Sequence, residues 1–395
     1  MWTVTQGYFE MPKPLQQQSA ADDELQMFST AVVRFLEQEA PPARTAAWRE
    51  QGSVERDFWR KAGEMGLLGV SVPAEYGGGG GDFRHDTILI DQVARREVSG
   101  FAVALHNGVV TPYVVTHGTE QQKQRWLPRL CSGELIAAVA MSEPGVGSDL
   151  QRIRTVGRRE GDGYRISGQK TFITNGQLAN FIVVAVKTDP TQGAKGISLL
   201  VLEAEEAQGF RRGRKLDKIG CEAQDTSELF FDEVWVPREN LLGGVEGCGF
   251  KQLMAELPRE RLVIAIQSQA MLEVALEETI AYTKERHAFG RPIFDFQNTQ
   301  FKLAEARTGA TVARAFLDQC IGKVLDGSLS GAEAAMAKYW ISELQNRVID
   351  DCLQLHGAYG YTNEFRIGRM YRDARVSRIY GGSNEIMKLL IARSL

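Results

Sequence analysis

Apolar residues recur at helical spacing near the start of the chain. Leu25, Phe28, Val32 and Phe35 fall on one face of a helix predicted over residues 22–40. Similar patterns with N-capping residues predict further helices: residues 53–65 with Ser53 as N-cap, residues 86–105, and a helix opened by a capping box of Thr119 and Gln122. After a Gln-rich tail at residues 1–20, we therefore expect an α-helical domain over residues 21–130.

The pattern changes after residue 130 to short runs of β-branched, aromatic and small apolar residues. Turn sequences such as Glu-Gly-Asp-Gly at 160–163 separate these runs, as is typical of strands joined by tight connections. The predicted strands lie at residues 137–140, 164–166, 170–175, 180–186, 196–202 and 229–236. We expect a β domain over residues 131–240.

Long helical patterns return in the last third of the chain. The predicted helices cover residues 250–284, 298–325, 331–355 and 384–393. Long helices joined by short loops that contain glycine are typical of an antiparallel bundle. We expect this helical domain to cover residues 241–395, which gives an α+β protein in the order helices, sheet, helices.

Composition narrows the class of protein. Of 395 residues, 43% are hydrophobic and 24% charged, and the net charge of −4 gives no reason to expect nucleic-acid binding. The five cysteines form no CxxC pair, which favours reduced thiols and a cytoplasmic location. The first 18 residues lack an export or transit pattern, and the longest aliphatic run, at 182–186, is too short to span a membrane.

Three sequence features could suggest a nucleotide-binding or metal-binding enzyme, but none of them supports such a class. The glycines at 77–81 follow no strand, and no position satisfies G-x-G-x-x-G, so we expect a flexible loop there. The stretch 163–171 nearly matches a P-loop but has one residue too many and no helix after it. The five histidines show no ligand spacing, so no metal site is expected. A nicotinamide dehydrogenase and an NTPase are therefore not supported.

The stretch 137–149 carries the first candidate chemistry. It leaves an apolar, strand-like run and enters a turn rich in glycine, proline and hydroxyl groups, including Ser142 and Ser148. About twenty residues later, the run at 170–175 adds Phe172 and further hydroxyls. A flat heteroaromatic cofactor needs such an aromatic face and polar donors. Taken alone, two ordinary strand ends with turn chemistry explain these residues better.

Glu260 carries the second candidate chemistry. It lies on the same helical stripe as Leu253, Leu257 and Ile264, so its carboxylate is expected to lose water. Desolvation raises the pKa of a carboxyl toward the range of a general base. The alternative is a structural carboxylate that pairs with a neighbouring arginine, and without further support this alternative is favoured.

A glycine-rich loop before the last helix is the third candidate. Tyr380, Gly381 and Gly382 precede Ser383, which is a candidate N-cap. Adjacent glycines ahead of a helix leave backbone N–H groups free to meet a carbonyl or phosphate oxygen. A simple cap and turn would give the same pattern.

Together and in this order, these segments resemble the acyl-CoA dehydrogenase family from about residue 20 to the C-terminus. Five motifs carry the resemblance: MSEPGVGSD at 141–149, FITN at 172–175, ERHAFG at 285–290, QLHGAYG at 354–360 and YGGSNE at 380–385. The resemblance implies an N-terminal α-helical domain, a middle β-barrel and a C-terminal four-helix bundle. It also implies bound FAD and a homotetramer built as a dimer of dimers.

The resemblance assigns two groups of residues to FAD. Ser142 and Thr174 would bond the ring edge, and Phe172 stands where many relatives carry Trp, which keeps an aromatic face. Arg286, Gln297 and residues 354–358 would reach the FAD of a neighbouring subunit, and the Arg286 guanidinium is suited to pyrophosphate. The full set of cofactor residues is Met141, Ser142, Gly147, Ser148, Phe172, Ile173, Thr174, Arg286, Phe289, Gln297, Gln354, Leu355, His356, Gly357, Ala358, Ser383, Asn384 and Glu385.

One departure from the family pattern bears on the mechanism. Many members carry the catalytic Glu directly after the tyrosine that matches Tyr380, where this chain has Gly381. The long-chain and isovaleryl branches carry their base at the position of Glu260, and the LPRERL sequence around it is most similar to the long-chain type. The resemblance therefore assigns Glu260 and Gly381 to catalysis. The expected substrate contacts are Ser148, Lys251, Pro258, Arg259, Arg261, Tyr380, Gly381 and Gly382.

The implied reaction converts a saturated acyl-CoA thioester to a trans-2-enoyl-CoA, as in fatty acid β-oxidation. Glu260 would take the α-proton, the β-hydrogen would leave as hydride to flavin N5, and Gly381 N–H would bind the thioester oxygen. An electron-transferring flavoprotein is the expected acceptor. The alternatives are a dehydrogenase for an acyl group on a carrier protein, a non-catalytic flavin-binding protein, and, less favoured, an oxidase. Neither the length nor the branching of the acyl chain follows from the sequence.

Overall fold

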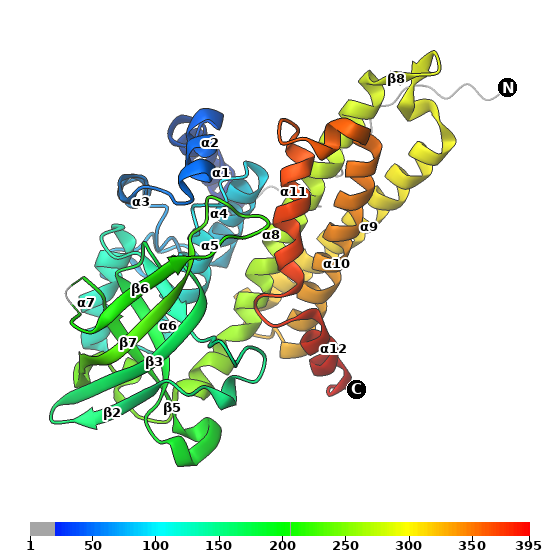
Figure 1. Ribbon diagram of the computed structural model, residues 1–395. Coiled ribbons are helices and arrows are strands. Elements are labelled where there is room, and N and C mark those ends of the chain that lie inside the picture. The colour runs from blue at the N-terminus through cyan, green and yellow to red at the C-terminus, as the bar shows by residue number, and fades with distance from the viewer. Residues whose placement is uncertain (1–19, 206) are drawn as a thin grey trace.

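The structure is a computed structural model that describes residues 20–205 and 207–395. The predicted Gln-rich tail lies outside the described residues, except for Ala20. Helices, then a sheet, then long helices follow one another along the chain (Figure 1). The fold class expected from the sequence is therefore confirmed, with the middle part formed by a curled sheet.

The N-terminal part is helical, as expected. Its α-helices are α1 (Ala20–Glu39), α2 (Pro42–Gln51), α3 (Arg56–Glu64), α4 (Phe83–Arg95), α5 (Val103–Leu105), α6 (Thr111–His117) and α7 (Glu120–Cys131). A π-helix at His106–Val110 joins α5 to α6. The predicted capping box of Thr119 and Gln122 is present at the start of α7.

Three local predictions in this part are wrong. The second predicted helix begins at Arg56 rather than near Ser53, with Glu55 as its N-cap. The helix predicted over 86–105 ends at Arg95, because the left-handed Glu97 (φ 53°) turns the chain away. The glycine loop at 77–81 is held by backbone hydrogen bonds, for example from Gly79 N to Gly69 O.

The middle part is a seven-stranded sheet in the order β1-β4-β2-β3-β7-β6, with β5 paired to β4. Its strands are β1 (Ala137–Ala140), β2 (Val156–Glu160), β3 (Gly163–Thr174), β4 (Phe181–Lys187), β5 (Ile197–Glu203), β6 (Phe210–Lys215) and β7 (Thr226–Pro237). β2 and β6 were not predicted, because sequences such as FRRGRK lack apolar alternation. Register shifts in the antiparallel β3–β7 pairing at 166–168 and 170–173 accompany the bending of these two long strands.

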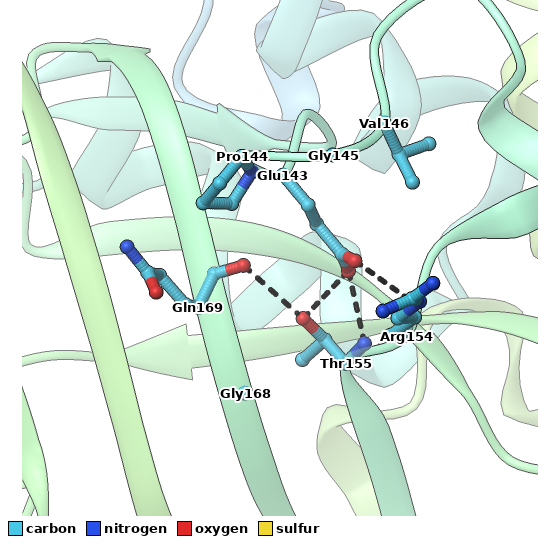
Figure 2. A pocket seen from close by; sticks show the side chains of 8 residues that line it. All are labelled: Glu143, Pro144, Gly145, Val146, Arg154, Thr155, Gly168 and Gln169. Atoms are coloured by element: carbon cyan, nitrogen blue, oxygen red, sulfur yellow. Dashed lines mark hydrogen bonds between the residues drawn. The ribbon is translucent and has the colours of Figure 1, made fainter.

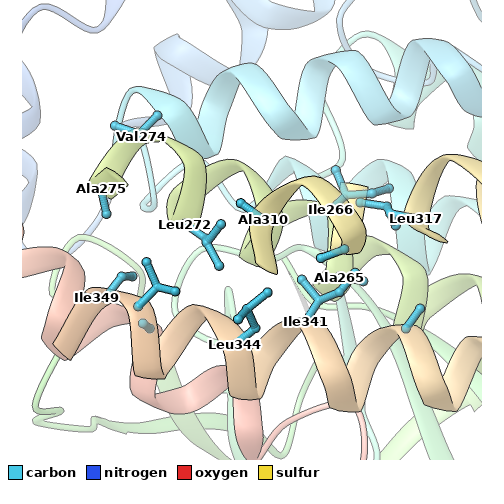
Figure 3. Packing of buried hydrophobic residues seen from close by; sticks show 14 of the residues in the cluster. Ala265, Ile266, Leu272, Val274, Ala275, Ala310, Leu317, Ile341, Leu344 and Ile349 are labelled. Atoms are coloured by element: carbon cyan, nitrogen blue, oxygen red, sulfur yellow. The ribbon is translucent and has the colours of Figure 1, made fainter. Parts of the chain in front are cut away.

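The C-terminal part is a bundle of long helices around one apolar core. Its helices are α8 (Gly249–Glu285), α9 (Gln297–Leu325), α10 (Gly331–His356), α11 (Arg366–Ala374) and α12 (Asn384–Ala392), and the β8 (His287–Ala288) and β9 (Arg291–Pro292) hairpin joins α8 to α9. Leu272, Ala310, Ile341 and Leu344 interleave between α8, α9 and α10 (Figure 3). α11 was missed by the sequence analysis. No helix of the described residues is long and apolar enough to cross a membrane.

The 37-residue helix α8 connects all three parts of the molecule. Near its start, Leu253 packs in a cluster with Phe181 and Val183 of the sheet. Between two and three turns later, Leu262 and Val263 join a core that contains Phe83 and Ile90 of α4 as well as the bundle. The helix continues through Pro258. Residues of α8 near position 260 therefore lie where the three parts meet.

Candidate active site at the junction of the three parts

Glu260 is buried at this junction and bonded to a tyrosine of another helix. Only 6% of its surface is exposed, and the Tyr113 hydroxyl on α6 donates a hydrogen bond of 2.6 Å to Glu260 Oε1. Burial raises the pKa of Glu260 to about 7, because a charged carboxylate is poorly solvated there. A carboxyl with a pKa near neutrality can accept a proton and release it again at physiological pH.

A second acidic residue lies one turn earlier on α8. The charge of Glu256 raises the pKa of Glu260, whereas the Tyr113 hydrogen bond and the charge of Arg261 lower it. His117 Nε2 lies 3.1 Å from Glu256 Oε1, within ion-pair distance but without the alignment of a hydrogen bond. Tyr113 and His117 on α6 thus face Glu260 and Glu256 on α8, each pair separated by one helical turn.

The neighbouring arginines do not pair with Glu260. Arg259 Nη2 donates to Asp86 Oδ2 at 2.7 Å, and its guanidinium lies over the Phe83 ring. Arg261 is buried, and within the described residues no hydrogen bond or ion pair joins it to Glu260. The structural alternative, in which a neighbouring arginine neutralises Glu260, therefore lacks its ion pair.

The loop at 380–384 packs on α8 one turn after Glu260. Gly381 has a left-handed backbone (φ 61°), and a Cβ atom there would lie 2.2 Å from Ile264 Cδ1. The buried Lys338 of α10 donates to Gly382 O at 2.7 Å and to Asn384 Oδ1 at 2.8 Å. Ser383 occupies the N-cap position of α12, although its side chain makes no capping hydrogen bond. Packing and hydrogen bonds thus fix a loop that has no room for a side chain at position 381.

The candidate cofactor wall consists of the segments that follow β1 and end β3. Thr171 N donates to Ser142 O at 3.0 Å, which joins the two segments. Phe172 has a left-handed backbone (φ 59°) and exposes 69% of its surface. Exposure of a large aromatic side chain in a strained conformation indicates a surface kept for a ligand.

A buried ion pair between Glu143 and Lys170 supports this wall, and Figure 2 shows the further hydrogen bonds between Glu143, Arg154 and Thr155. Glu143 accepts hydrogen bonds from Arg154 N, from the backbone and hydroxyl of Thr155, and from Lys170 Nζ at 3.0 Å. Lys170 also donates to Met141 O at 2.9 Å, and burial lowers the pKa of Lys170 to about 8. A cavity of about 280 Å³ opens beside Glu143 and Gln169. These hydrogen bonds fix the 141–146 turn relative to β3.

Family models match nearly all of the described chain. The N-terminal, middle and C-terminal domains of acyl-CoA dehydrogenase match residues 22–134, 138–234 and 247–395. The chain belongs to the acyl-CoA dehydrogenase family. It is therefore an oxidoreductase acting on CH–CH groups, in a family of flavoproteins that dehydrogenate acyl-CoA.

Individual relatives agree with this assignment. The mitochondrial long-chain specific acyl-CoA dehydrogenase of Sus scrofa is 45% identical over 371 residues, which are 93% of this chain and 86% of the relative. A solved acyl-CoA dehydrogenase from Geobacillus kaustophilus is 47% identical with a TM-score of 0.92, covering 96% of this chain and 99% of that one. A solved chain named for the electron transferring flavoprotein of Acidaminococcus fermentans is 33% identical with a TM-score of 0.90, at the same coverages.

The residues at the wall suit a flavin cofactor of this acyl-CoA dehydrogenase. Within the described part of the chain, the hydroxyl groups of Ser142, Ser148 and Thr174 make no hydrogen bond, so they are available to a ligand. A Cβ atom at Gly147 would meet no atom within 4 Å, so the turn is open on that side. The exposed ring of Phe172 completes a surface with an aromatic face and free donors.

The residues expected to reach a neighbouring subunit lie elsewhere. Arg286, Gln297, Gln354, Gly357 and Ala358 are exposed, as is Phe289, another expected cofactor residue. They belong to the end of α8, the β8–β9 hairpin, the start of α9 and the end of α10 with the turn after it, which lie at the end of the bundle far from the sheet (Figure 1). Phe289 exposes 95% of its surface. His356 is different: it is buried and stacks on Tyr282 at 4.2 Å, with Nδ1 bound to Cys352 O, so it holds the helix end together.

Several residues around Glu260 were missed by the sequence analysis. Tyr113, His117, Glu256 and Lys338 were not among the candidates. The i, i+4 spacing of Tyr113 with His117 and of Glu256 with Glu260 is visible in the sequence, but the sequence does not show that the two pairs meet. Among the substrate candidates, Lys251 is exposed and Tyr380 is 40% exposed.

Proposed function

We propose that this acyl-CoA dehydrogenase uses FAD to convert a saturated acyl-CoA thioester to the trans-2-enoyl-CoA, with Glu260 as the base. The observation that carries the proposal is the buried Glu260 carboxyl, whose pKa of about 7 suits proton abstraction. Position 381, where many relatives carry their base, holds a glycine whose side-chain direction is filled by Ile264.

The FAD ring would lie against Phe172, with the Ser142 and Thr174 hydroxyls at its edge and Met141, Gly147, Ser148 and Ile173 nearby. When bound, FAD supplies the chemistry that accepts the β-hydrogen as hydride. Residues of a second subunit at the hairpin end of the bundle, led by Arg286 and Gln297, would complete the site in a homotetramer. Their exposure supports this role. Ser383, Asn384 and Glu385 would contribute from the start of α12.

Acidification of the α-hydrogen requires stabilisation of the thioester oxygen, since a base of pKa about 7 is too weak on its own. The N–H of Gly381 would donate to that oxygen. The Lys338 hydrogen bond to Gly382 O fixes the loop, so the donor needs little reorganisation during the reaction. Glu260 lies on α8 one turn before Ile264, the residue that packs against Gly381, and takes the α-proton. Its burial excludes water that would compete for the developing charge.

The remaining assignments complete the proposal. Ser148, Lys251, Pro258, Arg259, Arg261, Tyr380 and Gly382 are the proposed substrate contacts, although Arg259 already pairs with Asp86. An electron-transferring flavoprotein is the proposed acceptor, supported by the relative named for one. The proposed location is the cytoplasm; the Sus scrofa relative is mitochondrial.

The Glu260→Gln variant tests the assignment of the base. We expect it to keep its yellow FAD but to lose bleaching by acyl-CoA about a thousandfold, the scale of general base catalysis. Anaerobic stopped-flow absorbance with butanoyl-, octanoyl-, hexadecanoyl- and isovaleryl-CoA measures this loss and also reports chain preference. Glu64→Gln removes a carboxylate from an exposed position of α3 and should bleach normally. Bleaching of the Glu260→Gln variant at near the wild-type rate would contradict the assignment.

A further inference from the structure

Tyr113 is a buried phenol that the proposed reaction does not yet use. None of its surface is exposed, and within the described residues its hydroxyl makes one hydrogen bond, to Glu260 Oε1. The two residues are 147 positions apart, so this bond joins α6 of the N-terminal part to α8. At 2.6 Å it has the short length of an O–H donor to a carboxylate.

The Tyr113 ring is itself held firmly. It packs in an apolar cluster with Val110, Val114, Trp126 and Leu253. Pro112 directly precedes Tyr113 in the first turn of α6, and its ring restricts the backbone there. A rigid donor of this kind fixes the direction of the carboxylate that it binds.

The two oxygens of Glu260 therefore differ. Oε1 accepts the Tyr113 hydroxyl, whereas no hydrogen bond from the described residues reaches Oε2. We propose that Tyr113 is a positioning residue for the base: its hydroxyl holds Oε1 and leaves Oε2 as the oxygen that takes the α-proton. This inference rests on the proposed role of Glu260 as the base.

The charges around Glu260 make such a fixed donor necessary. Glu256 on α8 repels the Glu260 carboxylate and Arg261 on α8 attracts it, while Tyr113 on α6 is the hydrogen-bond donor. Beyond them, His117 of α6 faces Glu256, and burial together with the charge of Arg261 lowers the pKa of Lys338 on α10. The Tyr113 hydroxyl favours the charged form of Glu260, so its removal should raise the pKa of this carboxyl and release its orientation.

The Tyr113→Phe variant tests the inference because it keeps the ring and removes only the hydroxyl. Bleaching of the flavin by the acyl-CoA that reacts fastest with the wild type is measured against pH. On the acid side of the pH profile, here called the acid limb, bleaching slows as Glu260 becomes protonated. We expect the midpoint of this limb to move up by about one pH unit, so that the bleaching rate below the midpoint falls about tenfold. We also expect a lower plateau at high pH, because the carboxylate is no longer oriented.

Tyr164→Phe is the matched control. It removes a buried tyrosine hydroxyl bonded to a glutamate, Glu246 at 2.7 Å, but in the middle part of the chain. This variant should keep both the wild-type midpoint and the wild-type plateau. If Tyr113→Phe matches the control in both, Tyr113 does not position the base and the inference is overturned.

Two further measurements distinguish a failure of this inference from a failure of the proposed function. Glu260→Gln is assayed in parallel, and normal bleaching by that variant would overturn the proposed function whatever Tyr113→Phe does. If Tyr113→Phe does not take up FAD, 3-fluorotyrosine is incorporated at position 113 instead. Its more acidic hydroxyl strengthens the bond and should move the acid limb to lower pH. An unchanged limb in that protein would overturn the inference.

Discussion

Glu260 and Glu256 share one face of α8, and their separation of one turn couples their charges. Because Glu260, as the proposed base, must be deprotonated to act, the bleaching rate of the wild type should rise with pH through the pKa of Glu260 at about 7. The charge of Glu256 raises that pKa, so Glu256→Gln should lower it and move the acid limb to lower pH. The variant should therefore bleach faster than the wild type below the wild-type midpoint.

Stopped-flow bleaching across pH measures this shift. Glu64→Gln again serves as control, because it makes the same charge change on the exposed surface of α3. The amide that Glu256→Gln introduces can still face His117, so the contact between α6 and α8 is kept. A limb that stays in place or moves to higher pH would show that Glu256 does not set the pKa of the base.

For single residues, the sequence predicts burial better than it predicts contacts between distant elements. Glu260 was found because helical periodicity places it on an apolar stripe, and it is indeed buried. Tyr113 could not be assigned to it, because 147 residues separate the two and only the packing of α6 on α8 brings them together. The exposure of Phe172 also depends on a left-handed backbone that no local pattern indicates.

The loop before α12 and the helix α8 fit each other at one contact. Gly381 has φ 61°, and a Cβ atom there would clash with Ile264 Cδ1 at 2.2 Å. Gly381→Ala should therefore displace the loop and slow bleaching about tenfold or more, since small misplacements at a reacting centre are costly. Ile264→Val removes the clashing Cδ1 atom alone, so the double variant should recover part of the loss.

Rates of bleaching for the wild type, both single variants and the double variant form a double-mutant cycle. Recovery stays incomplete, because alanine at a positive φ still costs about 1 kcal/mol. Ile264→Val alone should lower the free energy of unfolding by about 1 kcal/mol with little effect on bleaching. If the two substitutions act additively, Ile264 is not what excludes a side chain at position 381.

The long helices of the bundle were predicted well, whereas the short elements β6 and α11 were not. α8, α9, α10 and α12 agree with prediction to within one residue at each end. By contrast, β6 has four cations among its six residues, and α11 has only nine residues, although its buried Ile367, Met370 and Ala374 share one face. The unpredicted elements gain their stability from tertiary pairing, β6 with β7 and α11 with α10, which sequence periodicity does not report.

At the scale of the whole molecule, the N-terminal helices and the bundle pack together at one junction. α4 packs along α8, and its apolar residues Phe83 and Ile90 enter the bundle core. The hydrogen bond between Tyr113 and Glu260 crosses the same junction. The order of helices, sheet and bundle could be predicted from composition and periodicity, whereas their packing around one end of α8 could not, because it consists of contacts distant in sequence.

A buried ionic cluster closes this junction on the side of α9. Glu273 of α8 accepts two hydrogen bonds of 2.9 Å from Arg314 of α9 and another from Arg95 of α4. Gln269 adds a bond of 2.8 Å to the same carboxylate. Only 3% of Glu273 is exposed, and the arginines hold the pKa of its carboxyl below the usual 4.5 despite burial. One carboxylate thus joins helices from both helical parts.

Glu273→Gln should weaken this junction, because it removes one of the two carboxylates that Arg95 and Arg314 share and leaves them Asp91. We expect the free energy of unfolding to fall by about 2 kcal/mol, less than for a fully buried pair since both arginines are partly exposed. Since the folded-state pKa of Glu273 is lowered, its contribution is fully present above pH 4.5 and is lost as pH falls through the lowered value. The thermal midpoints of wild type and variant, measured by scanning calorimetry of the FAD-loaded protein, should therefore differ near neutral pH and converge in acid.

The control is Glu160→Gln, at an exposed pair with Arg158, which should change the free energy of unfolding by no more than about 0.5 kcal/mol. A Glu273→Gln midpoint equal to that of this control would show that the cluster does not stabilise the junction.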